Sequence, residues 1–121
     1  MRPKTLLIGA SSNPERYSYK AIQMLLQHGY PCEALALRPG RIGDLVFHVG
    51  TPSFDSIDTV TLYINASHQA SYMDYIISLQ PRRIIFNPGT ENPVLVAAVM
   101  KNNIHCEMAC TLVLLQTGQY D

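Results

Sequence analysis

The chain has 121 residues, enough for a single domain over residues 1–121 with an ordinary hydrophobic core. Its nine basic and nine acidic side chains cancel, which excludes the excess positive charge typical of nucleic-acid-binding proteins. No apolar run approaches the roughly 18 residues of a membrane span, and no signal peptide opens the chain. The three cysteines fit no disulfide framework. We therefore expect a soluble, cytoplasmic protein that binds neither nucleic acid nor membrane.

The first thirty residues read as a strand, a tight polar turn and a helix. Leu6–Ile8 is a short apolar run, typical of a strand buried on both faces of a parallel sheet. Gly9 allows a sharp turn, and residues 11–13 place small polar groups in it. A helical pattern follows Pro14 and stops at Gly29. The N-terminus of such a helix favours a phosphate, although an ordinary turn without a ligand is the alternative.

Further along the chain, short apolar runs alternate with helical patterns. After the first strand, we expect strands at 34–37, 60–64, 84–86 and 104–107, with 45–47 as a short edge strand. Ser67 is the expected N-cap of a helix that Gln80-Pro81 stops. Asn92 is the expected N-cap of the next helix, with Pro93 at its first position, and a short helix covers 111–117. This alternation predicts an α/β fold with a mostly parallel sheet of five to six strands.

Ligands of such folds bind at the carboxyl ends of the strands, near the point where the strand order reverses. The loops expected at those ends cover residues 9–16, 38–41, 65–67 and 87–90. They are rich in glycine, arginine, asparagine and serine, which are the residues that a phosphate-bearing ligand uses. The sequence therefore predicts a nucleotide-type ligand at this edge of the sheet.

The first turn does not match an NAD-binding turn. It contains one glycine, Gly9, instead of the G-x-G-x-x-G pattern, and the second strand ends in Arg38 instead of an acidic residue. No P-loop sequence occurs in the chain. A cation at the end of the second strand suits an additional ribose phosphate, which leaves NADP or coenzyme A as candidates.

Several stretches resemble the small stand-alone CoA-binding proteins, whose domain is similar to the N-terminal part of the succinyl-CoA synthetase α subunit. The most specific stretch is Gly9–Tyr19, Gly-Ala-Ser-Ser-Asn-Pro-Glu-Arg-Tyr-Ser-Tyr. The other matching positions are Leu26, Gly29-Tyr30, Arg38-Pro39, Ile57-Asp58, Val60, Gly89 and Cys110. The chain also departs from the family pattern: Leu37-Arg38-Pro39 stands where members usually have Val-Asn-Pro, and Phe86-Asn87-Pro88 where they often have an aromatic residue and a glutamine.

The resemblance implies a Rossmann-like three-layer domain that binds coenzyme A or an acyl-CoA. NADP, which the cation after the second strand also allows, is then the weaker candidate. It implies that the first turn holds the CoA phosphates and that Arg41, the basic residue after Pro39-Gly40, contacts the ligand. From the loops and the resemblance together, the expected cofactor-binding residues are Gly9, Ser11, Ser12, Asn13, Pro14, Arg16, Ser18, Tyr19, Arg38, Pro39, Arg41, Asn65, Asn87, Pro88 and Gly89.

No catalytic or metal-binding group is recognisable. The four histidines lack metal-ligand spacing, and Cys106 and Cys110 stand four apart, without the further ligands that zinc needs. No serine, histidine and carboxylate arrangement can be drawn. A non-catalytic binding module is the preferred interpretation. Two alternatives stay open: an NADP- or acyl-CoA-using enzyme with chemistry from Cys110 or His68, and a domain that has lost its ligand. The sequence identifies neither a protein partner nor an oligomeric state.

Overall fold

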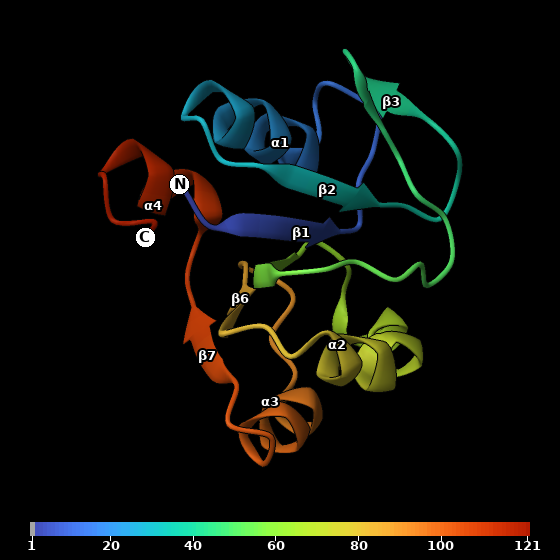
Figure 1. Cartoon of the computed structure of the whole chain (residues 1–121), viewed down its shortest axis with the longest axis vertical. Coiled ribbons are helices and arrows are strands. Elements are labelled where there is room, and N and C mark those ends of the chain that lie inside the picture. Colours follow the sequence, from blue (N-terminus) through green and yellow to red (C-terminus); the bar gives the residue numbers. More distant parts are fainter. Residues whose placement is uncertain (1) are drawn as a thin grey trace.

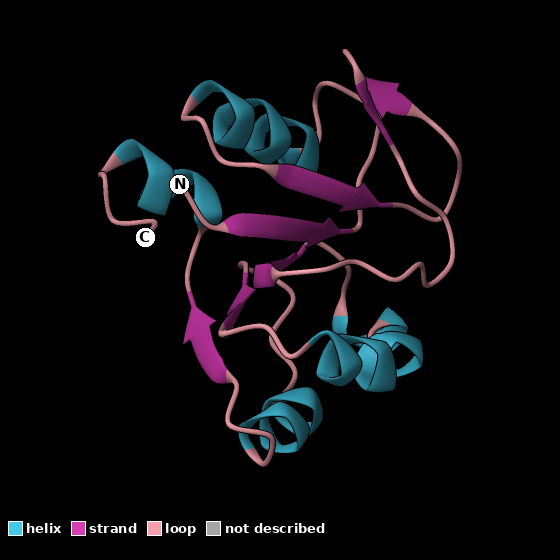
Figure 2. Cartoon of the chain, viewed as in Figure 1, coloured by secondary structure: helices cyan, strands magenta, loops and turns pink. Residues whose placement is uncertain are grey.

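The computed structural model describes residues 2–121 as alternating strands and helices (Figures 1 and 2). The strands are β1 (Lys4–Ile8), β2 (Cys32–Leu35), β3 (Arg41–Ile42), β4 (Leu45–Val46), β5 (Ile57–Leu62), β6 (Arg83–Phe86) and β7 (His105–Met108). The α-helices are α1 (Tyr17–Gln27), α2 (Met73–Leu79), α3 (Pro93–Met100) and α4 (Thr111–Gln116), and two short 3₁₀ turns, η1 (Ala66–His68) and η2 (Ala70–Tyr72), precede α2.

The main sheet has five parallel strands in the order β2-β1-β5-β6-β7. On the free edge of β2, His48 forms a single parallel bridge with Leu35. The bridge is held by hydrogen bonds from Ala36 N to His48 O and from His48 N to Ala34 O, both 2.9 Å. The sixth strand of the expected sheet is thus reduced to one bridge. If it is counted, the strand order is that of a Rossmann fold, and the order reverses between β1 and β5.

The helices cover both faces of the sheet, with α1 and α4 on one side and α2 and α3 on the other (Figure 1). Successive side chains of a strand point to opposite faces. In β1, Leu7 packs with the residues of α1 and α4, whereas Leu6 and Ile8 pack with those of α2 and α3. A strand that is buried on both faces favours a continuous apolar run, as in Leu6-Leu7-Ile8 of β1. The central strand β5 instead buries Thr59 and Thr61, whose hydroxyls bond to Arg83 and Thr111. The expected α/β three-layer fold is confirmed.

The expected helix starts were right in one case and wrong in another. The side chain of Asn92 caps α3, because its Oδ1 accepts from Val94 N and Leu95 N, and Pro93 is the first helical residue. Ser67 caps no helix: it lies inside η1, and its hydroxyl donates to Asn65 Oδ1. The polar residues 65–69 form tight turns instead, and α2 begins only at Met73.

The second strand ends earlier than expected, at Leu35 instead of Leu37. Leu37 is 71% exposed, because the chain turns at Ala36 and leaves the sheet. Beyond it, β3 and β4 form an antiparallel hairpin, which pairs Arg41 with Val46 and Ile42 with Leu45. Of the short edge strand expected at 45–47, Leu45 and Val46 form β4, which pairs with β3 and not with the main sheet. The strand β3 was not expected, since two residues are too few for a recognisable pattern.

A buried cluster closes the amino-terminal ends of the strands. Tyr120 is 1% exposed, and its hydroxyl shares a hydrogen bond with Thr5. Arg83 of β6 lies with its guanidinium 4.6 Å from the centre of the Tyr120 ring and donates to Thr59 Oγ1 and to the Tyr120 carbonyl. Glu107 lies 3.5 Å from the same guanidinium, so the buried charge is paired. This end of the sheet is filled by the chain itself, and the opposite end is left open.

Candidate functional site

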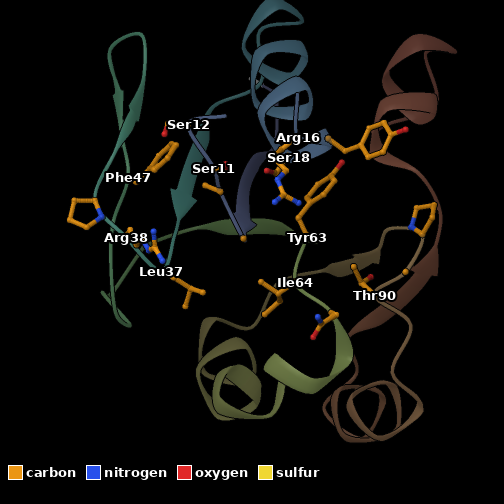
Figure 3. A pocket seen from close by; sticks show the side chains of 17 residues that line it. Ser11, Ser12, Arg16, Ser18, Leu37, Arg38, Phe47, Tyr63, Ile64 and Thr90 are labelled. Carbon is orange, nitrogen blue, oxygen red and sulfur yellow. The ribbon is translucent and has the colours of Figure 1, made fainter. Parts of the chain in front are cut away.

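An open pocket of about 750 Å³ lies at the carboxyl ends of β1, β2, β5 and β6, beside the point where the strand order reverses. Its volume falls within the roughly 300–1,000 Å³ typical of ligand pockets. Figure 3 shows the side chains that line it, which come from the loops after these four strands, the start of α1 and the residue after β4. The lining residues are Gly9, Ala10, Ser11, Ser12, Arg16, Tyr17, Ser18, Leu37, Arg38, Pro39, Phe47, Tyr63, Ile64, Asn65, Pro88, Gly89 and Thr90.

The loop between β1 and α1 is held by its own hydrogen bonds. Ser11 Oγ accepts from Asn13 N at 3.1 Å, and Asn13 Oδ1 accepts from Glu15 N at 3.0 Å. Gly9 has φ +106°, and a Cβ there would lie 2.8 Å from the carbonyl carbon of Tyr63. Glycine is therefore required because the ends of β1 and β5 touch at this point, whether or not a ligand is bound.

The start of α1 faces the pocket. Its N-cap, Arg16, is extended and its side chain makes no capping hydrogen bond. Within residues 2–121, the backbone N–H groups of Tyr17, Ser18 and Tyr19 have no acceptor, and the first helical bond runs from Lys20 N to Arg16 O. The Ser18 side chain, 5% exposed, lines the pocket at the same place. Such a helix start attracts an anion.

Among the described lining residues, the charged side chains are those of two arginines. Arg16 precedes α1 and Arg38 follows β2, so that they reach the pocket from different loops (Figure 3). No aspartate, glutamate, lysine, histidine or cysteine is among the described residues of the lining. One carboxylate lies close by: Glu91 Oε1 accepts from Gly89 N at 3.0 Å. The pocket is therefore positively charged on the side of the first two loops.

Two buried side-chain amides hold the segments around the pocket in place by hydrogen bonds. Asn87, 2% exposed, donates to Thr61 Oγ1 at 2.7 Å and to Leu62 O at 2.8 Å, and its Oδ1 accepts from Thr111 N at 2.8 Å. It thus joins β5, β6 and the start of α4. Gln69 is fully buried and donates to the carbonyls of Ile64 at 3.0 Å and Thr90 at 2.7 Å. It joins the loop after β5 to the loop after β6.

The Tyr63 ring forms part of the pocket wall, while its hydroxyl is buried. No hydrogen-bond partner for this hydroxyl exists in the described part of the chain. Burial raises the pKa of the Tyr63 phenol well above its ordinary value. The phenol therefore stays neutral at physiological pH and contributes no charge to the pocket.

The structure brings ten of the fifteen expected binding residues to the pocket lining. These are Gly9, Ser11, Ser12, Arg16, Ser18, Arg38, Pro39, Asn65, Pro88 and Gly89. The other five lie outside it: Asn13, Pro14, Tyr19, Arg41 and Asn87.

Each of these five residues has another place in the fold. Asn13 and Pro14 shape the exposed far side of the first loop, and Tyr19 packs against the core beneath α1. Arg41 belongs to β3 on the hairpin. Asn87 faces the interior, where its amide is already bonded.

The lining also contains residues outside the expected binding set, namely Ala10, Tyr17, Leu37, Phe47, Tyr63, Ile64 and Thr90. Of these, Ala10 and Thr90 lie in loops that were expected to carry the site, and Tyr17 lies in the matching stretch Gly9–Tyr19. Tyr63 and Ile64 directly follow β5, which ends at Leu62. The sequence placed both inside an expected strand at 60–64, so no signal marked them as pocket residues. The residues raised as candidates for chemistry, Cys110 and His68, are not among the lining residues. All three cysteines are free, and no cluster of potential metal ligands occurs within residues 2–121.

Comparison with family models matches residues 3–116 to a family described as CoA binding domain. No curated protein matches the chain. A crystal structure described as that of an uncharacterized protein is 39% identical, covers 98% of both chains and superposes with a TM-score of 0.95.

Two more distant structures share the fold. A hypothetical protein from Pyrococcus horikoshii OT3 is 20% identical, with a TM-score of 0.86, over 96% of this chain and 83% of that one. A Thermus thermophilus protein, cell-free ID.343, is 15% identical, with a TM-score of 0.85, over 98% of this chain and 90% of that one. Among residues 2–121, no helix has the length and apolar character needed to cross a membrane.

Proposed function

Because the chain belongs to the CoA binding domain family, we propose that it binds coenzyme A or an acyl-CoA in the pocket at the strand ends. The observation that carries this proposal is the positive side of that pocket. Unpaired N–H groups at the start of α1 and the guanidinium groups of Arg16 and Arg38 face the same pocket, and no carboxylate side chain is among its described lining residues. CoA carries a diphosphate and a separate phosphate on its ribose, and both need such partners.

Two sides of the pocket suit two neighbouring parts of this ligand, the diphosphate and the pantetheine arm. The start of α1, with Ser18 and Arg16, suits the diphosphate. The loops after β5 and β6 contribute Asn65, Pro88 and Gly89, which present amide and backbone groups to the uncharged pantetheine arm. The free cysteines fit a reducing, cytoplasmic setting for this binding.

We further propose that the protein does not transform its ligand. A general acid or base must reach the reacting group and exchange a proton near neutral pH. Among the described lining residues, none is a histidine, cysteine, carboxylate or lysine. Arginine stays protonated, and burial raises the pKa of Tyr63, so neither exchanges protons readily near neutral pH. The composition of the lining supports a carrier, sensor or subunit and gives the enzyme alternative no reacting group.

Thermal denaturation with added nucleotides tests the binding. A ligand that binds the folded state alone stabilises it by about 2.7 kcal/mol at 100 times Kd. For a domain of this size, that corresponds to a rise of roughly 5–15 °C in melting temperature. We expect this rise with CoA and acetyl-CoA and none with NAD. NADP, which like CoA carries a diphosphate and a ribose phosphate, is the comparison. An equal rise with NAD, or none with any nucleotide, contradicts the proposal.

A thiol assay tests the absence of turnover. Incubated with acetyl-CoA or succinyl-CoA, the protein should release no free thiol above the buffer control. Release that disappears in Cys110→Ala would instead favour the enzyme alternative, and it would show that Cys110 reaches the ligand.

A further inference from the structure

The two arginines near the end of β2 differ in where they point. Arg38 lines the pocket, on the side opposite Arg16 in the close view (Figure 3). Arg41 is exposed on β3 and is not part of the lining. The family resemblance implies a contact from Arg41, the basic residue after Pro39-Gly40. The structure therefore places the guanidinium of Arg38, and not that of Arg41, at the pocket.

The loop that carries Arg38 is fixed at both ends by the returning chain. Ala36 N donates to His48 O at 2.9 Å, and Phe47 N donates to Gly40 O at 2.9 Å. The loop also packs closely on the Phe47 ring, because a Cβ at Gly40 would lie 3.1 Å from it. The backbone on either side of Arg38 is thus held in place, which lowers the entropic cost of a contact with a ligand.

The surroundings of Arg38 combine an unpaired charge with apolar surface. Within the described residues, its guanidinium takes part in no ion pair or hydrogen bond with a side chain or the backbone. Leu37, 71% exposed, and Phe47 lie on the same side of the pocket (Figure 3). A planar guanidinium beside apolar surface matches an adenosine whose ribose carries a phosphate.

We propose that Arg38 is the residue that selects ligands with a phosphate on the adenosine ribose, and that Arg41 takes no part. This inference rests on the proposed function, since it assigns the second anionic group of CoA to a residue in the same pocket. The diphosphate is bound at the start of α1, and the ribose phosphate is bound by Arg38 at the end of β2. The chain thereby uses a different residue for this contact from the one that the resemblance implies.

Calorimetric titration of CoA and of dephospho-CoA, which lacks the ribose phosphate, tests this assignment. We expect Arg38→Gln to lower the affinity for CoA about ten- to a hundredfold, as for the loss of a hydrogen bond to a charged group. The same substitution should change the affinity for dephospho-CoA less than about twofold. Arg41→Gln should change neither affinity. Lys101→Gln, at the exposed end of α3, removes one positive charge away from the pocket and is the charge-matched control. Added salt should reduce the preference of the wild-type protein for CoA.

The outcomes separate the alternatives. Equal losses for both ligands in Arg38→Gln would show that Arg38 only shapes its loop, and a CoA-specific loss in Arg41→Gln would return the contact to Arg41. Either result overturns the assignment to Arg38, while the proposal that the protein binds CoA still stands. If the wild-type protein binds neither ligand, the proposed function itself fails. Unchanged melting temperatures of the ligand-free variants show that any affinity loss is not a loss of folded protein.

Discussion

Replacing Asn87 with alanine should destabilise the folded protein without directly lowering its affinity for the ligand. The Asn87 side chain is buried, and it is the partner of two backbone groups, Leu62 O and Thr111 N. Alanine leaves both groups without a partner, at about 1.5 kcal/mol each, or about 3 kcal/mol together. Thr61 is affected less, because its hydroxyl keeps the bond to the Thr111 hydroxyl. At about 4 °C per kcal/mol, the melting temperature should fall by roughly 10–15 °C.

The assay compares melting temperature with CoA affinity, measured by calorimetry at a temperature where each variant is folded. The matched variant is Asn65→Ala, which removes the same side chain from an exposed position in the pocket lining. Asn65→Ala should change stability by less than about 0.5 kcal/mol and lower the affinity for CoA. Asn87→Ala should show the opposite pattern. If Asn87→Ala kept its melting temperature and lost CoA binding, Asn87 would be a ligand contact and the reasoning would be refuted.

Three further predictions concern the rest of the fold. Gly9→Ala should lower the urea midpoint, since its Cβ would lie 2.8 Å from the Tyr63 backbone; an unchanged midpoint would disprove the close contact. Burial alone would raise the pKa of Asp58, but hydrogen bonds and the charge of Arg82 outweigh it and lower that pKa. Asp58 therefore stabilises the fold above pH about 4 and loses this effect as the pH falls, so Asp58→Asn should reduce the loss of unfolding free energy on acidification, measured with urea, by about 0.2–1 kcal/mol. Tyr120→Ala should cost about 3–5 kcal/mol in urea unfolding and Tyr120→Phe much less, because the buried ring carries most of the effect.

The sequence predicts the layers of the fold well, because a segment that is buried on both faces can be recognised as a short apolar run. A strand such as β1 can hold no charged residue at its centre, so Leu6-Leu7-Ile8 identifies it without reference to the rest of the chain. The start of α3 is predicted for a similar local reason. Asn92 and Pro93 act only on the residues beside them, and no distant contact overrides them.

Other features depend on contacts between distant segments, which the sequence does not display. Asn87 and Asn65 both follow a strand and look alike as polar loop residues, yet one bonds inward and the other lines the pocket. Gln69 joins the loop after β5 to the loop after β6, and this link can be recognised only in the folded structure. Phe47 enters the pocket because the hairpin folds back over the loop after β2. Sequence patterns report burial and local caps, whereas the direction of an isolated side chain is set by the assembled fold.

The central claim is that CoA binds at the carboxyl ends of the strands, and amide chemical shifts measured by NMR during a CoA titration test it most directly. We predict that the amides of Ser12, Ser18, Arg38 and Gly89 shift on addition of CoA, because all four residues line the pocket. The amide of Tyr120, at the opposite end of the sheet, should stay unchanged. Shifts centred on the opposite end, or no saturable shifts at all, would contradict the account.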